Sequence, residues 1–193
     1  ATVLYDKDGQ LWMVYGSWFG GLYVLKLDNK TGLRDYSYTY ADDRDSSDGI
    51  ASDVYLGKRV SGGFGGTGEG PYIVYSKETD YYYLYTSYDG LNCLDTFSGY
   101  HMRLFRSKNI DGPYLDAAGR NAVRSSSSDA QYLKGIKIMG NYYLSSLSGA
   151  NDVSWAKSGY MSPGHNSALI DEEGNAFLIY HTRFKAGFDE GYE

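Results

Sequence analysis

The feature that most constrains the fold is a repeated pattern in which two short, aromatic-rich apolar runs flank a turn containing Gly, Asp or Asn. Such runs are typical of β-strands, and the turn residues tolerate the tight backbone of a hairpin. In the clearest case, Asp8-Gly9 predicts a turn, residues 11–15 a strand, Gly20-Gly21 a second turn and residues 22–27 the next strand. The pattern predicts an all-β fold.

Three further stretches repeat this pattern. They cover residues 72–88, residues 136–149 with a turn at Gly140-Asn141, and residues 167–184 with a turn near Gly174. An outer strand is predicted to follow the second hairpin within residues 102–114. Small antiparallel sheets of this kind, repeated around an axis, predict a β-propeller.

The spacing of the turns allows about three blades in this chain, whereas propellers close with ~4 to 8. We therefore expect residues 1–193 to form a single, partial propeller domain that is truncated at both ends. Residues 35–53 and 120–131 lack a helical apolar period and are predicted to be long loops. Loops of this length are often functional or mobile.

Composition excludes several classes of function. With 18 basic against 24 acidic residues and no basic cluster, a nucleic-acid partner is not expected. No apolar run reaches the roughly 18 to 20 residues that a membrane helix needs, so membrane insertion is not expected either. The one cysteine, Cys93, has no partner for an internal disulfide and is interpreted as a packing residue. The first residues show no signal-peptide pattern.

Glu69 is the strongest catalytic candidate. It follows a glycine-rich run, residues 62–68, and immediately precedes a strand predicted to begin at Pro71. The glycines allow the backbone to approach a ligand closely, and a carboxyl group fixed at a strand entrance can donate a proton to a leaving group. The spacing is equally compatible with a structural role, in which Glu69 accepts backbone hydrogen bonds in a glycine turn.

A second polar group, His165 and Asn166, is predicted to follow a Pro-Gly turn and to precede a strand. A histidine without further ligands at metal-binding spacing is more often a hydrogen-bonded structural residue than a metal ligand. Trp18 and Phe19, at the end of a strand, present aromatic rings that suit stacking on sugars. The alternative for both is the ordinary preference of strands for aromatic residues.

Several ordered segments together resemble a known family. DKDGQLWMVYGSWFGG, GEGPYI, YYYLYTSYDGL, MRLFRSKNIDGPY, GIKIMGNY, PGHNSA and FLIYHTRF are similar to the endo-arabinanase branch of glycoside hydrolase family 43. The resemblance covers nearly the whole chain. It implies a five-bladed propeller and hydrolysis, with inversion, of α-1,5-linked arabinofuranose chains.

The resemblance also implies roles for individual residues. Glu69 in GEGP matches the general acid, and His165 in GHNS matches a residue that helps to hold a central cation, usually calcium, largely through water. The family's general base and the aspartate that tunes the acid match no position of this sequence. Asp6 and Asp8 belong to a hairpin turn, and Asp53 lies in a predicted loop. We therefore expect this chain to be inactive on its own.

The sequence thus predicts a glycosidase that acts on a neutral plant polysaccharide or oligosaccharide and that works outside the cytoplasm, in the periplasm, at the cell surface or in the medium. Asn166 is expected to contact substrate, and Arg103 and Arg183 are expected to donate hydrogen bonds to it. Two alternatives remain. One is a β-xylosidase or α-L-arabinofuranosidase of the same family, and the other is a carbohydrate-binding propeller without catalysis.

Overall fold

The computed structural model describes residues 1–40, 56–66, 68–88, 100–130, 134–140 and 161–183, and these residues confirm the all-β prediction. Every regular element in them is a β-strand except for one 3-10 turn, Trp18–Gly20. That turn is far too short to cross a membrane, and the described residues contain no longer helix.

The first sheet is antiparallel, has the order β1-β2-β3-β4 and comes from the first hairpin unit. Its strands are β1 (Thr2–Tyr5), β2 (Leu11–Gly16), β3 (Leu22–Lys26) and β4 (Lys58–Ser61). The predicted turn at Asp8-Gly9 is present, because the Asp6 carboxylate accepts hydrogen bonds from the backbone N–H of Asp8 and Gln10, both at 2.9 Å. The same carboxylate accepts the indole N–H of Trp12 at 2.8 Å. These bonds confirm that Asp6 is a turn residue.

The second sheet repeats this order as β5-β6-β7-β8, and the third contains only β9 and β10. The strands are β5 (Glu69–Ser76), β6 (Tyr81–Tyr88), β7 (His101–Ser107), β8 (Ile136–Met139), β9 (Met161–Ile170) and β10 (Ala176–Arg183). The hairpins predicted within residues 72–88 and near Gly174 are therefore confirmed. The second strand of the hairpin predicted at Gly140-Asn141 lies outside the described residues, and β8 itself pairs with β7.

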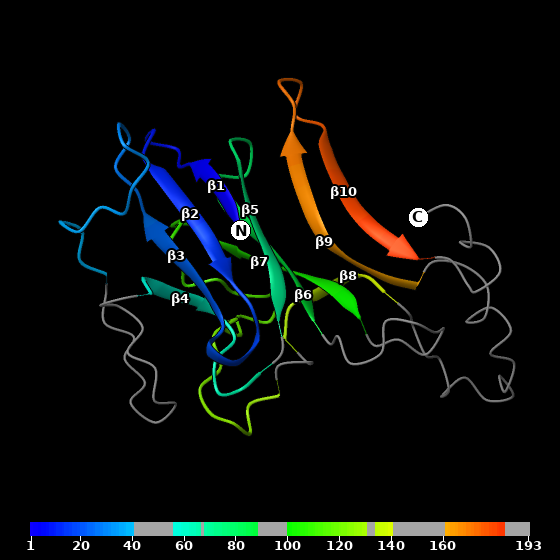
Figure 1. Cartoon of the computed structure of the whole chain (residues 1–193). Coiled ribbons are helices and arrows are strands. Elements are labelled where there is room, and N and C mark those ends of the chain that lie inside the picture. Colours follow the sequence, from blue (N-terminus) through cyan, green and yellow to red (C-terminus); the bar gives the residue numbers. More distant parts are fainter. Residues whose placement is uncertain (41–55, 67, 89–99, 131–133, 141–160, 184–193) are drawn as a thin grey trace, which may run out of the picture.

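Strand β5 lies between the other two sheets (Figure 1). It contacts β1 and β2 of the first sheet on one side and β9 of the third sheet on the other. The hairpin turns that follow β1, β5 and β9 lie at the same end of the molecule in Figure 1. Each of these three strands therefore begins toward the opposite end. This arrangement brings Glu69, the first residue of β5, close to β9.

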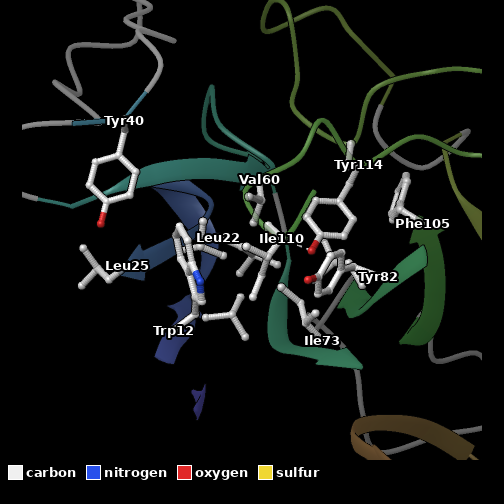
Figure 2. Close-up of a cluster of buried hydrophobic side chains, with 14 of the residues drawn as sticks. Trp12, Leu22, Leu25, Tyr40, Val60, Ile73, Tyr82, Phe105, Ile110 and Tyr114 are labelled. Carbon is white, nitrogen blue, oxygen red and sulfur yellow. Dashed lines mark hydrogen bonds between the residues drawn. The ribbon is translucent and has the colours of Figure 1, made fainter. Parts of the chain in front are cut away.

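The main apolar core lies between the first and second sheets (Figure 2). Alternation along the strands supplies it: in β2, Trp12 and Val14 are buried, and in β6, Tyr82 and Leu84 are buried. The segment after β7 closes the core with Tyr114, whose hydroxyl donates to the carbonyl of Ile110 at 2.9 Å. The third sheet contributes little to this cluster. Most of its buried apolar side chains come from the first and second sheets.

The predicted long loops agree with the structure where it describes them. Residues 35–40 and 120–130 contain neither helix nor strand, while residues 41–53, which include Asp53, lie outside the description. The second loop is tied to the glycine-rich run, because Gly62 donates to the carbonyl of Ala122 at 3.1 Å and Arg124 donates its N–H back to Gly62 at 2.9 Å.

Candidate functional site

Glu69 lies at the entrance of strand β5, but as its first residue rather than before it. The prediction that the strand begins at Pro71 was wrong, because Glu69 already pairs with Ser87 of β6. The next pair is Tyr72 with Tyr85, so Gly70 and Pro71 together face a single residue of β6. This β-bulge, in which Gly70 has a φ of 57°, bends the strand and re-aims the preceding side chain.

The Glu69 carboxylate accepts hydrogen bonds from two aromatic side chains. The Tyr100 hydroxyl donates to Oε1 at 2.6 Å, and the indole N–H of Trp18 donates to Oε2 at 3.3 Å. The Glu69 side chain keeps 26% of its surface exposed, so it is held in place and still reachable from solvent. A carboxyl group in this setting can exchange a proton with a bound molecule.

His165 and Asn166 lie inside strand β9, so the predicted Pro-Gly turn before a strand was also wrong. Gly164 pairs with His181 and Ser167 pairs with Ile179, which leaves His165 and Asn166 opposite one residue of β10. This is a second bulge, and it places His165 at a φ of 45°, a value that non-glycine residues seldom adopt. The bulge turns the imidazole toward Glu69.

Tyr100 joins His165 to Glu69. Its hydroxyl lies 3.1 Å from Nδ1 of His165, and that nitrogen is 3.7 Å from Oε1 of Glu69. Because the single hydroxyl proton of Tyr100 is donated to Glu69, the hydrogen-bond pattern assigns a proton to Nδ1 of His165. The backbone N–H of His165 donates to the Ser87 hydroxyl at 2.9 Å, which fixes this strand against β6.

His181 of β10 packs beside Tyr100 and His165. Its ring stacks on those of Tyr100 and His165, with centroids 6.1 and 6.0 Å apart. Desolvation lowers the pKa of His181 and the nearby His165 lowers it further, while Glu69 acts in the opposite direction. The imidazole of His181 is therefore neutral at neutral pH.

A cavity of about 500 Å³ adjoins these residues, and its lining includes His165, Asn166 and His181. Asn166 is 5% exposed, and neither its amide nitrogen nor its amide oxygen has a hydrogen-bond partner. Buried amides are nearly always paired, so the Asn166 amide is an exception beside this cavity.

The other predicted site residues are distributed unevenly. Trp18 touches Glu69 through its indole N–H, whereas the side chain of Phe19 is outside the description. Arg103 donates to Nε2 of His101 at 2.8 Å and to the carbonyl of Lys134 at 2.6 Å, so these donors are used inside the protein. Arg183 ends β10, two residues beyond His181. Trp18, His165 and Asn166 are thus the predicted residues that gather around Glu69 or its cavity.

A cation at this site would find few protein ligands. The described residues contain no group of three or more His, Cys, Asp and Glu side chains placed to hold a metal ion. With Nδ1 carrying a proton, a neutral His165 offers one lone pair on Nε2, and calcium prefers several oxygen ligands. These residues do not form a calcium cage, and they fit at most an ion whose other ligands are water.

Tyr100, Ser87 and His181 contact Glu69 or His165, or stack beside them, and the sequence reasoning did not identify them. Tyr100 is one of 22 tyrosines, and it lies in neither of the two sequence motifs that contain Glu69 and His165. His181 offered a weak signal, because the equivalent position in the other hairpins carries a small residue, Gly16, Thr86 or Ser145.

The chain is similar to several known proteins over nearly its whole length. The sequence profile of glycosyl hydrolases family 43 matches residues 1–192. The extracellular endo-α-(1→5)-L-arabinanase of Thermotoga petrophila is 46% identical over 99% of this chain, and the extracellular endo-α-(1→5)-L-arabinanase 2 of Bacillus subtilis is 39% identical over 96%. The chain spans 36% of the length of each of these relatives.

Solved structures show the same relationship. The crystal structure of the endo-1,5-α-L-arabinanase from Thermotoga petrophila superposes with a TM-score of 0.71 at 44% identity, over 96% of this chain and 37% of that one. An α-L-arabinanase from Cellvibrio cellulosa in complex with arabinohexaose superposes with a TM-score of 0.59 at 29% identity, over 96% of this chain and 48% of that one. The chain belongs to glycosyl hydrolases family 43.

Proposed function

We propose that the full-length protein hydrolyses α-1,5-linked arabinofuranose chains with inversion and that Glu69 is the general acid. Two relatives that share 46% and 39% identity with the chain carry the name of this activity. The observation that carries the proposal is the Glu69 carboxylate, held at a strand bulge by Tyr100 and Trp18 and still partly exposed.

In this mechanism Glu69 gives its proton to the glycosidic oxygen as the bond to the departing sugar breaks. A base carboxylate on the opposite face takes a proton from the attacking water, and the two carboxyl groups must stand about 6.5 to 9.5 Å apart to admit that water. We assign the base to a part of the protein beyond this chain. After transfer, the O–H of Tyr100 and the N–H of Trp18 stabilise the Glu69 carboxylate.

We assign the substrate contacts to residues around the cavity and Glu69. The amide of Asn166, which has no partner in the structure, would bind a sugar hydroxyl once its side chain turns toward the cavity, and Arg183, the last residue of β10, is a second proposed donor. The rings of Trp18 and Phe19 remain proposed stacking surfaces for furanose. Arg103 is the weakest of these assignments because its donors already serve protein acceptors.

The remaining parts of the proposal concern the whole protein. We infer a five-bladed propeller, for which the two four-stranded sheets would be complete blades and the β9–β10 hairpin part of a third. A calcium ion near the axis would take one ligand from His165 and complete its shell with water. The substrate would be a neutral plant polysaccharide met outside the cytoplasm, as the names of the extracellular relatives suggest.

One alternative has specific support. An extracellular exo-α-(1→5)-L-arabinofuranosidase from Cellvibrio japonicus is 30% identical over 93% of the chain. Exo action would release a single small product from chain ends, whereas endo action yields a ladder of oligosaccharides early in the reaction. Chromatography of the first products from linear arabinan separates these two modes.

Glu69→Gln in the full-length protein tests the proposed role directly. The substitution keeps the shape of the side chain and removes the transferable proton, so kcat on linear arabinan should fall by about 10²- to 10⁴-fold. The release of reducing ends at saturating substrate measures this loss.

Glu78→Gln is the matched control, because Glu78 is exposed in the turn between β5 and β6. It should leave kcat unchanged within a factor of two or so, as expected for a surface substitution far from the site. Full activity in the Glu69→Gln protein would instead favour a carbohydrate-binding propeller or a different acid.

A further inference from the structure

The two oxygens of Glu69 have different surroundings. Oε1 lies 2.6 Å from the Tyr100 hydroxyl and 3.7 Å from Nδ1 of His165. Oε2 has the indole N–H of Trp18 at 3.3 Å. The first distance is that of a short O–H···O hydrogen bond, and the second is longer than the usual N–H···O bond.

From this asymmetry, and building on the proposed function, we propose that Tyr100 is a positioning residue that occupies Oε1 of Glu69 and leaves Oε2 to deliver the proton. An oxygen that already accepts a short hydrogen bond has less electron density to share with a proton. The proton of the neutral carboxyl group therefore resides on Oε2. Trp18 contacts that oxygen only weakly and leaves it free to turn toward a ligand.

Tyr100 is rigid enough to perform this role. It is 3% exposed, and its ring stacks on that of His181 at an interplanar angle of 22°. Gly164 lies against the ring edge so closely that a β-carbon at residue 164 would stand 2.2 Å from Cε1 of Tyr100. The hydroxyl is thus fixed, and it fixes the Glu69 side chain in turn.

The Oε2–H bond of Glu69 breaks and its proton joins the glycosidic oxygen, while the electron pair of the breaking C–O bond stays with that oxygen. Water supplies the new C–O bond and loses its proton to the base carboxylate of the proposed mechanism. Tyr100 keeps its own proton throughout and strengthens its hydrogen bond as charge develops on Glu69.

The test compares two leaving groups in full-length Tyr100→Phe. Linear arabinan has a sugar leaving group that needs the proton, whereas a 2,4-dinitrophenyl glycoside of an α-1,5-linked arabino-oligosaccharide has one that departs as an anion. We expect kcat on arabinan to fall about 10- to 100-fold, with KM changed less than about twofold and kcat on the aryl glycoside changed less than about threefold.

Tyr83→Phe is the control, because it removes a tyrosine hydroxyl that donates to Thr79 at 3.1 Å in an exposed turn; both substrates should be unaffected. An equal loss on both substrates for Tyr100→Phe, or no loss on arabinan, would overturn the assignment. Glu69→Gln separates this inference from the proposed function: if Glu69→Gln abolishes arabinan hydrolysis while Tyr100→Phe does not slow it, only the role of Tyr100 is refuted.

Discussion

Single residues set how closely strand β9 approaches the Glu69 group, and two glycines are decisive. A β-carbon on Gly164 would lie 2.9 Å from the Ser87 hydroxyl as well as 2.2 Å from the Tyr100 ring, and one on Gly70 would lie 3.1 Å from Cα of His165. Gly70 also needs its positive φ, whereas Gly164 is required for space alone. The closeness of the strands therefore depends on missing side chains as much as on bonds.

Gly164→Ala should displace the Tyr100 ring and with it the Glu69 carboxylate. We expect at least a ~10-fold loss of kcat, because shifts of about 1 Å in catalytic groups are costly. The crowding should also lower the free energy of unfolding by roughly 1 to 3 kcal/mol. Arabinan hydrolysis and urea unfolding of the full-length variant measure the two effects.

Gly9→Ala is the matched control for that substitution. Gly9 has a φ of 78°, but an added β-carbon would meet no atom within 4 Å. Alanine at residue 9 should therefore cost stability through backbone strain, about 1 kcal/mol, without changing kcat. Equal activity in the two variants would contradict the steric argument for Gly164.

At the scale of elements, the site is made by two bulges on adjacent strands. One bulge follows Glu69 in β5 and the other contains His165 in β9, and both strands contact β6. A regular strand would point successive side chains to alternate faces of its sheet. An extra residue breaks that alternation, which is how Glu69 and His165 come to face one another across two sheets.

These bulges also mark the limit of prediction from sequence. The hairpins were predictable because turn residues and alternation are local signals. Gly and Pro neighbours drew attention to Glu69 and His165 but left a structural role open for each, and the family resemblance supplied their expected roles. Those same neighbours were interpreted as strand boundaries, although Gly and Pro inside a strand also indicate a bulge. Tyr100 was missed because its contacts join residues that are 31 and 65 positions away in the chain.

The segment after β7 is held by one buried carboxylate, that of Asp116. Oδ1 accepts the backbone N–H of Ala118 and Arg120, both at 2.9 Å, and Oδ2 accepts that of Gly135 at 3.0 Å. Burial would raise the pKa of Asp116, but these bonds and the Arg120 guanidinium outweigh it, so the pKa is lowered. The charged form therefore stabilises the fold.

Asp116→Asn should lower the free energy of unfolding at pH 7 by about 1 to 3 kcal/mol. Because the folded pKa of Asp116 is depressed, its contribution is fully present above the unfolded value of about 3.9 and is lost as pH falls through the folded value. The difference between wild type and variant should shrink over that acidic range. Urea unfolding from pH 7 down to pH 3 checks this, with Asp8→Asn, an exposed site, expected to stay within ~0.5 kcal/mol of wild type.

For the whole molecule, the three sheets bury their apolar side chains to different extents. The core joins the first and second sheets, while the third leaves Leu169, Phe177 and Ile179 each about half exposed, at 47%, 50% and 52%. Among the described residues β10 pairs only with β9, so its other edge has no strand partner there. Apolar side chains beside an open strand edge favour association with further strands.

Residues 1–193 expressed alone should accordingly associate and should not hydrolyse linear arabinan. Glu69 supplies only the acid, and inversion requires a base carboxylate for which this sequence offers no match. Light scattering should show oligomers, and Phe177→Lys should shift them toward monomer by adding a charge to the exposed face without restoring activity. Turnover by the isolated chain comparable to that of the full-length protein would show that the second carboxylate is not needed or is already present.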